Sequence, residues 1–153
     1  MMLPRYLCSL LLPALLLVTL LPAEPVYAQG ADRIIGKWVS DEKNLVVKIY
    51  RRGDEFRAKI IWFKDEPGRP MEKWLDTKNP DSALRDRKVL GIEILWDLKY
   101  NKHSDSWQGG TVYDPKHGHE WNAAARIDDH GFLKVRGYWH LKLFGKTLTF
   151  HRQ

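Results

Sequence analysis

The sequence predicts an all-β protein, an eight-stranded antiparallel up-and-down β-barrel. Two observations predict this fold class. Segments of alternating apolar and polar residues follow one another through short turns, and no segment has the length and periodicity of an amphipathic helix. A sheet with one apolar face and no helix to cover it must pack on itself. A sandwich and a closed barrel both achieve this, and eight strands in up-and-down order favour the barrel.

The first 28 residues are expected to form a secretory signal peptide. Arg5 precedes an almost unbroken apolar run over residues 10–21, and Val26-Tyr27-Ala28 supplies small or medium-sized residues before the cleavage site. The run is short for a transmembrane helix, which favours a signal peptide. The alternative to a cleaved signal peptide is an uncleaved N-terminal anchor. Residues 29–153 then form one domain of a periplasmic or secreted protein. This domain contains no cysteine, since the single cysteine is Cys8.

The alternating pattern assigns eight strands. Residues 45–51 and 56–63 are rich in β-branched and aromatic side chains and flank Gly53-Asp54, which suits a two-residue hairpin turn with Gly at its first central position. Gly118 and Gly131 end two later turns. The predicted strands are residues 35–40, 45–51, 56–63, 89–98, 110–114, 120–128, 132–139 and 147–152.

The late strands separate their two faces most clearly. Trp121, Ala123, Ala125 and Ile127 share one face of residues 120–128. The opposite faces of the strands carry basic residues, and a basic side chain facing lipid costs roughly 2–4 kcal/mol at mid-membrane. We therefore expect water outside the barrel and no transmembrane segment after signal cleavage. The basic residues are Lys48, Arg57, Lys59, Arg126, Lys134 and Arg136.

One connection, residues 64–88, is much longer than the others. Long loops within compact domains usually serve as lids or binding loops, or are disordered. Asn79-Pro80 suits a helix start, with Asn as the cap and Pro as the first helical residue, so residues 80–85 are predicted to form one helical turn. We expect this loop to be ordered across one mouth of the barrel.

All seven tryptophans follow residue 28, and so many are not all expected to be exposed on the surface. Small residues on the apolar face, including Gly137, leave room either for buried indole rings or for a ligand, and both alternatives stay open. Because ligand pockets run to several hundred Å³, a void below about 100 Å³ would exclude a ligand inside the barrel.

Ordered motifs resemble two known families. Gly36-Lys37-Trp38, followed at the chain end by Arg152, looks like the lipocalins, in which the motif's tryptophan packs beneath a basic side chain of the closing strand. A wider set of motifs resembles a family of small exported bacterial proteins, domain of unknown function 2147, and this resemblance implies a lipocalin-like barrel in residues 29–153. Gly36, Trp38 and Arg152 are accordingly expected to close the barrel. The motifs are GKW (36–38), DTKNPDSALRDRKVLGIEIL (76–95), WQGGTVYDPKHG (107–118), LKVRGY (133–138) and FGKT (144–147).

Candidate ligand-binding residues fall in two clusters. The long loop contains Asp76, Asn79, Arg85 and Arg87, where arginine suits carboxylate and phosphate groups. The competing interpretation, that Asp76 pairs with an arginine and fixes the loop, is favoured. The second cluster, an aromatic platform beside a carboxylate, competes with a turn that merely starts at Asp114. It consists of Trp107, Tyr113 and Asp114, with Tyr138 as a further candidate.

No motif indicates a metal site, a cofactor or catalysis. His117-Gly118-His119 offers two metal-binding side chains but no third ligand can be placed, and no nucleophile or phosphate-loop motif occurs. The net charge of +6 fits an anionic partner, but solubility explains it equally well, and the expected compartment excludes nucleic acid. The leading hypothesis is binding of a small, partly hydrophobic or amphipathic molecule in the barrel under residues 64–88. The alternatives are a filled-barrel interaction module of the cell envelope and an enzyme at the barrel mouth, and the oligomeric state stays open.

Overall fold

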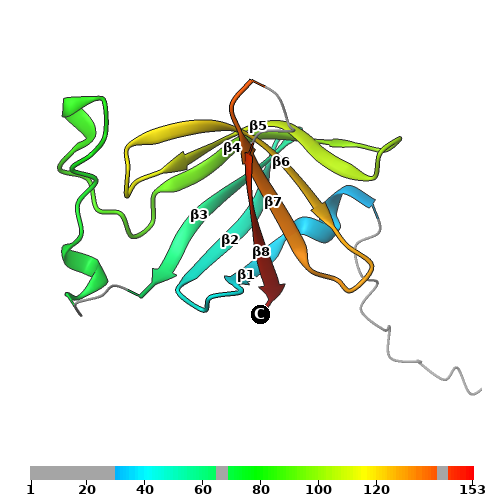
Figure 1. Cartoon of the computed structure of the whole chain (residues 1–153), viewed down its shortest axis with the longest axis horizontal. Coiled ribbons are helices and arrows are strands. Elements are labelled where there is room, and N and C mark those ends of the chain that lie inside the picture. Colours follow the sequence, from blue (N-terminus) through cyan, green and yellow to red (C-terminus); the bar gives the residue numbers. More distant parts are fainter. Residues whose placement is uncertain (1–29, 65–68, 141–144) are drawn as a thin grey trace, which may run out of the picture.

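Eight strands in consecutive order form a closed antiparallel barrel, so the predicted fold class is confirmed (Figure 1). The computed structural model describes residues 30–64, 69–140 and 145–153. The predicted signal peptide lies outside these residues. The strands are β1 (Gly36–Ser40), β2 (Leu45–Arg52), β3 (Glu55–Phe63), β4 (Glu93–Asn101), β5 (Ser106–Asp114), β6 (His119–Ile127), β7 (Leu133–Tyr138) and β8 (Gly145–Arg152); the 3-10 helices are η1 (Gly30–Ile34), η2 (Met71–Lys73) and η3 (Ser82–Leu84).

The barrel closes where β1 pairs with β8, and Trp38 lies directly opposite Arg152 in this pair. The Arg152 guanidinium carbon is 4.4 Å from the centroid of the Trp38 ring, and Nη1 of Arg152 donates to the carbonyl oxygen of Ile35 at 2.9 Å. Gly36 leaves space for this arginine, because a Cβ on Gly36 would lie 2.8 Å from Arg152 Nη1. Cation, indole and glycine therefore form one packed unit at the seam.

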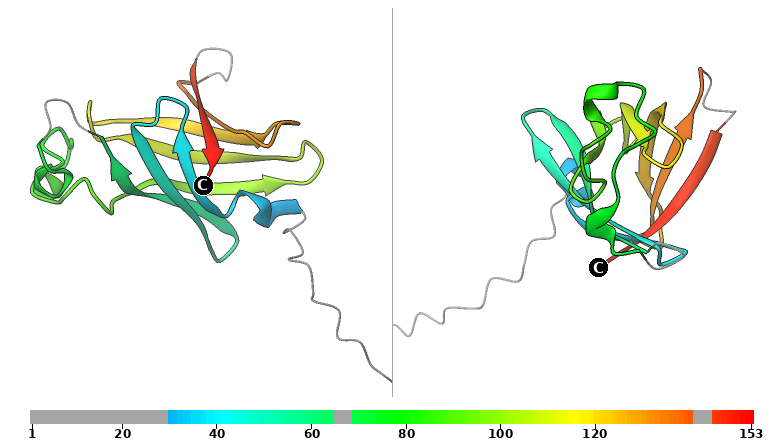
Figure 2. Two further views of the ribbon diagram at one scale, coloured as in Figure 1. Left: turned by 90° about the horizontal axis from the view of Figure 1, so that it is seen from below. Right: turned by 90° about the vertical axis from the view of Figure 1, so that its left-hand side faces the viewer.

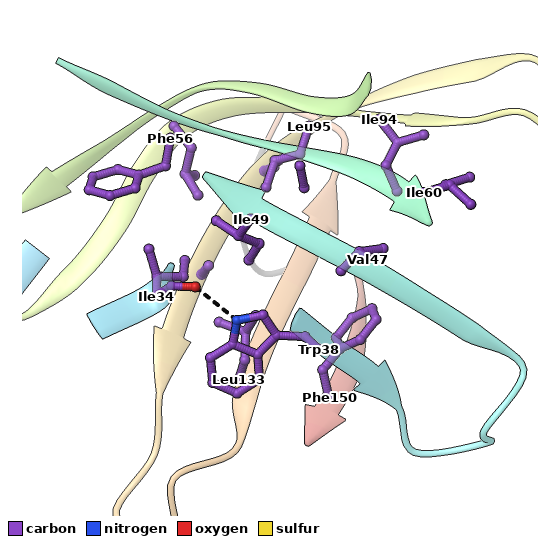
Figure 3. Close-up of a cluster of buried hydrophobic side chains, with 14 of the residues drawn as sticks. Ile34, Trp38, Val47, Ile49, Phe56, Ile60, Ile94, Leu95, Leu133 and Phe150 are labelled. Carbon is purple, nitrogen blue, oxygen red and sulfur yellow. Dashed lines mark hydrogen bonds between the residues drawn. The ribbon is translucent and has the colours of Figure 1, made fainter. Parts of the chain in front are cut away.

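The 3-10 helix η1 covers one end of the barrel. The fully buried Trp38 donates its Nε1 hydrogen to the carbonyl oxygen of Ile34 at 2.8 Å (Figure 3). Trp107 is also fully buried and donates from Nε1 to the carbonyl oxygen of Ala31 at 3.1 Å, and Arg33 lies over its ring. The indole N–H groups of two buried tryptophans are thus hydrogen-bonded to carbonyl oxygens of η1. Their rings pack at this end of the barrel.

The core cluster runs from the side chains packed on η1 to Val89 and Ile92 beside the long loop. Phe56 meets the ring of Trp107 edge to face, with 6.3 Å between centroids, and both side chains are buried. The remaining core side chains come from strands all around the barrel (Figure 3). They include Val47, Ile49, Ile60, Leu95, Leu98, Leu133 and Phe150.

The strand boundaries differ from the prediction where glycine redirects the chain. The predicted start of the fourth strand at residue 89 is wrong, since Gly91 has φ of 91° and the backbone turns before β4. The fifth strand starts at Ser106 rather than residue 110, because the pairs Tyr100–Trp107 and Asn101–Ser106 extend the ladder past Gly109. The two-residue turn at Gly53-Asp54 is confirmed, with φ of 63° at Gly53. None of the helices in the described residues is long and apolar enough to cross a membrane.

The long connection between β3 and β4 lies at the end of the barrel away from η1 (Figures 1 and 2). Its two arms meet at an antiparallel bridge between Leu75 and Lys88. The predicted helical turn exists as η3 but is capped differently: Asp81 accepts a hydrogen bond from the amide of Ala83 at 2.9 Å. Asn79, the expected cap, instead accepts from the amide of Asp81.

Replacing Trp38 with alanine is expected to lower the free energy of unfolding by roughly 3–5 kcal/mol, because the change leaves a cavity and removes the surface beneath Arg152. Urea denaturation followed by circular dichroism measures the loss. Trp139→Ala is the matched control: Trp139 is 58% exposed, so its loss should cost less than about 1 kcal/mol. A similarly small cost for Trp38→Ala would contradict the closure role.

Candidate functional site

A cavity of about 590 Å³, here called the mouth cavity, opens at the end of the barrel opposite η1. Its lining residues belong to the start of β4, the end of β5 and the turn that follows it, the start of β6, the end of β7 and the start of β8. Most of the lining is apolar. The apolar lining side chains include Ile94, Val112, Trp121, Val135, Tyr138, Trp139 and Leu148.

Cross-strand pairing places the apolar lining on the inner face. Val112 of β5 lies opposite Trp121 of β6, and Val135 of β7 lies opposite Leu148 of β8. Side chains directly opposite each other in an antiparallel pair share one face of the sheet. Gly137 pairs with Ala123 between these two pairs. Small residues of the inner face, Gly110, Ala123 and Gly137, thus lie side by side across β5, β6 and β7, and Gly137 lines the cavity.

Aromatic rings form the rim of the mouth cavity. Trp121 and Trp139 contact each other edge to face, with 5.8 Å between ring centroids. His119 meets the other side of this cluster, 6.0 Å from Trp121. Trp139 is more than half exposed although it lines the cavity. A half-exposed indole at a cavity entrance offers an apolar surface that a ligand can cover.

Three polar groups lie among these apolar residues. The Nδ1 atom of His117 is 2.6 Å from Oδ2 of Asp114, and Asp114 also accepts from the amide of Lys116 at 2.9 Å. Lys146 stands opposite Gly137 in the β7–β8 pair, so it is on the cavity side of β8. An aspartate that orients a histidine is typical of general bases. The described lining contains no serine, threonine or cysteine to act as a nucleophile, so the arrangement favours a polar anchor.

A buried carboxylate fixes the long loop to the barrel. Asp76 is fully buried and accepts from the Tyr113 hydroxyl at 2.5 Å, from Asn79 Nδ2 at 2.8 Å and from Arg87 Nε at 2.9 Å. Asn79 is also buried and bonds the Tyr113 hydroxyl at 3.1 Å. Each oxygen of the carboxylate has a donor, as a buried charge requires. These four residues are engaged with one another, as the loop-fixing interpretation expects.

The β5–β6 turn supports the same attachment. Gly118 has φ of 72°, and a Cβ there would lie 1.9 Å from the carbonyl oxygen of Lys78. Only glycine lets the loop backbone approach the turn this closely. Arg85 adds a hydrogen bond from Nε to the carbonyl oxygen of Asn79 at 2.8 Å. The loop therefore packs against the turn that carries Asp114 and His117.

The predicted site residues divide into three groups. Tyr113, Asp114 and Tyr138 line the mouth cavity. Asp76, Asn79, Arg85 and Arg87 hold the loop, and no residue of its described part, 69–88, lines the cavity. Residues 69–88 therefore do not cover the cavity as expected for this loop, whereas residues 65–68 lie outside the described residues. Trp107 is at the η1 end, so the platform predicted for it with Tyr113 and Asp114 does not form.

Most residues of the cavity were not predicted as site residues, among them His117, Trp121, Trp139, Lys146 and Leu148. The alternation in β6 already placed Trp121 on the same face as Ala123 and Ala125. Alternation of apolar and polar residues in β8 could likewise have placed Leu148 on the inner face of the barrel. The His117-Gly118-His119 pattern suggests His117 only as a metal ligand. The described residues contain no group of three or more His, Cys, Asp or Glu side chains arranged to hold a metal ion.

The sequence over residues 36–152, from β1 to β8, matches the model of a family described as "Uncharacterized protein conserved in bacteria (DUF2147)". The chain belongs to this family. The barrel is similar to protein HP1028 from the human pathogen Helicobacter pylori, which is described as a member of the lipocalin family. The two share 26% sequence identity with a TM-score of 0.67, over 78% of this chain and 82% of the Helicobacter chain. A comparison with curated proteins gives no match. Both predicted resemblances, to this family and to the lipocalin fold, are confirmed.

Ionisation of the hydrogen-bonded Tyr113 makes the free energy of unfolding depend on pH in the alkaline range. Burial, and then the hydrogen bond to Asp76, raise the pKa of Tyr113 from its ordinary 10.0 to about 12. A raised pKa means that the neutral phenol favours the folded state. This contribution is complete below pH 10.0 and is lost as the pH rises towards about 12.

We expect the unfolding free energy to fall between these pH values by up to about 1.4 kcal/mol per pH unit through Tyr113. Tyr113→Phe should remove this share of the slope, as measured by urea denaturation across the range. Tyr50→Phe is the matched comparison and should remove a similar share of the slope. Burial and the hydrogen bond to Glu93 raise the pKa of Tyr50 to about 12 as well. An unchanged slope in Tyr113→Phe would contradict the Asp76 contact.

Proposed function

We propose that this member of the family binds a small amphipathic molecule in the mouth cavity. The apolar part of the ligand contacts Trp121, Val135 and Leu148, and its polar end lies beside Lys146 and His117. The observation that carries the proposal is the apolar cavity of about 590 Å³ at the open end of the barrel. Small-molecule sites in proteins are typically concave, mostly apolar and about 300–1,000 Å³ in volume, with few polar groups.

The charges at the rim favour an anionic polar end. The ammonium of Lys146 attracts a carboxylate, sulfonate or phosphate, and His117 is held by Asp114 at the same rim. Asp114 itself is engaged by His117 and by the amide of Lys116, which reduces its repulsion of an incoming anion. An amphipathic anion therefore matches both the apolar wall and the rim.

The alternative of a filled barrel, acting only as an interaction module, requires side chains throughout the barrel axis. The volume of the mouth cavity is several times the limit of about 100 Å³ at which that alternative would be preferred. The tryptophans nearest the axis at the other end, Trp38 and Trp107, are engaged with η1. Ligand binding is the function that uses the remaining space.

Gly137→Leu tests this proposal by filling the cavity. Gly137 has no positive φ, and a Cβ there makes ordinary contacts of 3.5 Å with Val112 and 3.6 Å with Trp121, so the strand accepts a side chain. Fluorescence titration with 8-anilinonaphthalene-1-sulfonate, an amphipathic anion, should show saturable binding to the wild-type protein. Gly137→Leu should weaken binding by about tenfold or more, because overlap with the probe costs about 1–3 kcal/mol.

The control for this substitution is Ala124→Leu, on the outer face of the adjacent strand β6. It adds a larger apolar side chain outside the barrel and should leave the affinity for the probe unchanged. Circular dichroism checks that both variants fold. Equal probe binding by Gly137→Leu and the wild-type protein would contradict the proposal.

We also propose that the protein is exported, on the basis of the charged, apolar and small-residue segments of residues 1–28. When the full chain is expressed in a Gram-negative bacterium, the protein recovered from the periplasm should have the mass of residues 29–153. Replacing both Leu15 and Leu17 with arginine interrupts the apolar run and should leave uncleaved protein in the cytoplasm. Cytoplasmic wild-type protein of full-length mass would refute the proposal.

A further inference from the structure

A second concave surface lies on the outer face of the barrel, over β6, β7 and β8 and the start of β5. It has a volume of about 470 Å³ and is here called the outer groove. Its lining differs from that of the mouth cavity in being basic and rich in hydroxyl groups. It includes Ser106, Arg126, Lys134, Arg136, Thr147 and Thr149, with Ala124 among them.

Three cations gather in the outer groove. Arg126 lies directly opposite Lys134 in the β6–β7 pair, and Arg136 is two residues further along β7, on the same face. Like charges directly opposite each other in a sheet repel and destabilise it. Lys134 has one carboxylate nearby, with its Nζ 3.6 Å from Oδ2 of Asp128. No carboxylate among the described residues forms an ion pair with Arg126. The groove thus concentrates positive charge that a bound anion would offset.

The hydroxyl groups of the groove are oriented by the same cations. Lys134 donates from Nζ to Oγ1 of Thr149 at 3.0 Å, and Arg136 donates from Nη1 to Oγ1 of Thr147 at 3.0 Å. A hydroxyl oxygen that accepts from a cation keeps its own hydrogen available for donation. Guanidinium, ammonium and hydroxyl groups therefore combine into an array of donors. Such an array suits a ligand that only accepts hydrogen bonds.

The groove is concave because of a small residue. Ala124 lies opposite Arg136 in the β6–β7 pair and has the shortest side chain between Arg126, Arg136 and Thr147. The cationic groups around it can surround a compact anion from several sides. A flat anionic surface such as a membrane would contact the rim of the groove and leave its floor unfilled. This shape favours a small soluble anion.

We propose that the outer groove is a binding site for a soluble phosphate-bearing molecule, a phosphate ester or an oligophosphate, held by Arg126, Lys134 and Arg136. Arginine binds phosphate oxygens in pairs through its planar fork of N–H groups. The site is separate from the mouth cavity, because Arg136 and Gly137 are consecutive residues on opposite faces of β7.

Isothermal titration calorimetry with inorganic pyrophosphate tests the proposal, at constant ionic strength so that general screening does not change. The wild-type protein should bind one pyrophosphate with a saturable isotherm. Arg126→Gln and Arg136→Gln should each weaken binding by about tenfold, the effect of losing a hydrogen bond to a charged group. Ala124→Leu keeps the net charge but fills the floor of the groove, so it should abolish saturable binding.

Lys48→Gln is the matched control. It removes one positive charge from the outer face of β2, where Lys48 lies opposite Lys37 and Lys59, away from the groove. It should leave pyrophosphate binding unchanged, and Gly137→Leu should do the same. An equal loss in Lys48→Gln and Arg126→Gln would overturn the proposal, because the attraction would then depend only on net charge.

Vesicles distinguish a soluble phosphate from a lipid headgroup. Co-sedimentation is measured with phosphatidylcholine vesicles alone and with vesicles that contain phosphatidylglycerol. Pyrophosphate binding without enrichment on the phosphatidylglycerol vesicles supports the soluble phosphate. Binding to those vesicles with no pyrophosphate isotherm would overturn it.

Discussion

The packing of Arg152 over Trp38 is the contact on which the rest of the barrel depends. A sheet becomes a barrel only when its first and last strands pair in one register, and a shift of one residue would exchange the inner and outer faces of a strand. Trp38 and Arg152 are directly opposite each other in that last pair, and both also bind the chain leading into β1, through the carbonyl oxygens of Ile34 and Ile35. The register of β8 is therefore fixed by side chains at the seam as well as by backbone pairing.

The two ends of the barrel differ in how they are packed. The bulky rings of Trp38, Trp107 and Phe56 are buried and packed in the space next to η1. At the opposite end the inner face of β6 and β7 carries Ala123 and Gly137 in direct opposition. Bulky rings packed on η1 stabilise one end, so the barrel does not need to fill the space next to Gly137 at the other end. The cavity is thus a consequence of where volume is distributed along the strands.

Most of the fold could be predicted from the sequence, whereas the site could be predicted only in part. Alternation within strands is a local property, so it revealed all eight strands and the inner face of β6. It failed at Gly91 and Gly109, where a positive φ redirects or interrupts the chain. Trp107 and Tyr113 were grouped because they are close in sequence, but six residues of extended strand separate them by roughly 20 Å. The cavity brings together residues from five strands and one turn, and such a set depends on closure, which no local pattern contains.

The same closure also determines what the outer surface presents. Along β7, Val135 and Gly137 face the interior while Lys134 and Arg136 face outward; along β8, Leu148 faces inward while Thr147 and Thr149 face outward. Each strand thus contributes an apolar wall to one concave surface and a donor group to the other. A one-residue slip of β8 would place its threonines at the apolar cavity and its leucine beside the arginines. The Trp38–Arg152 contact opposes that slip, so the pairing at the seam maintains the chemistry of both concave surfaces.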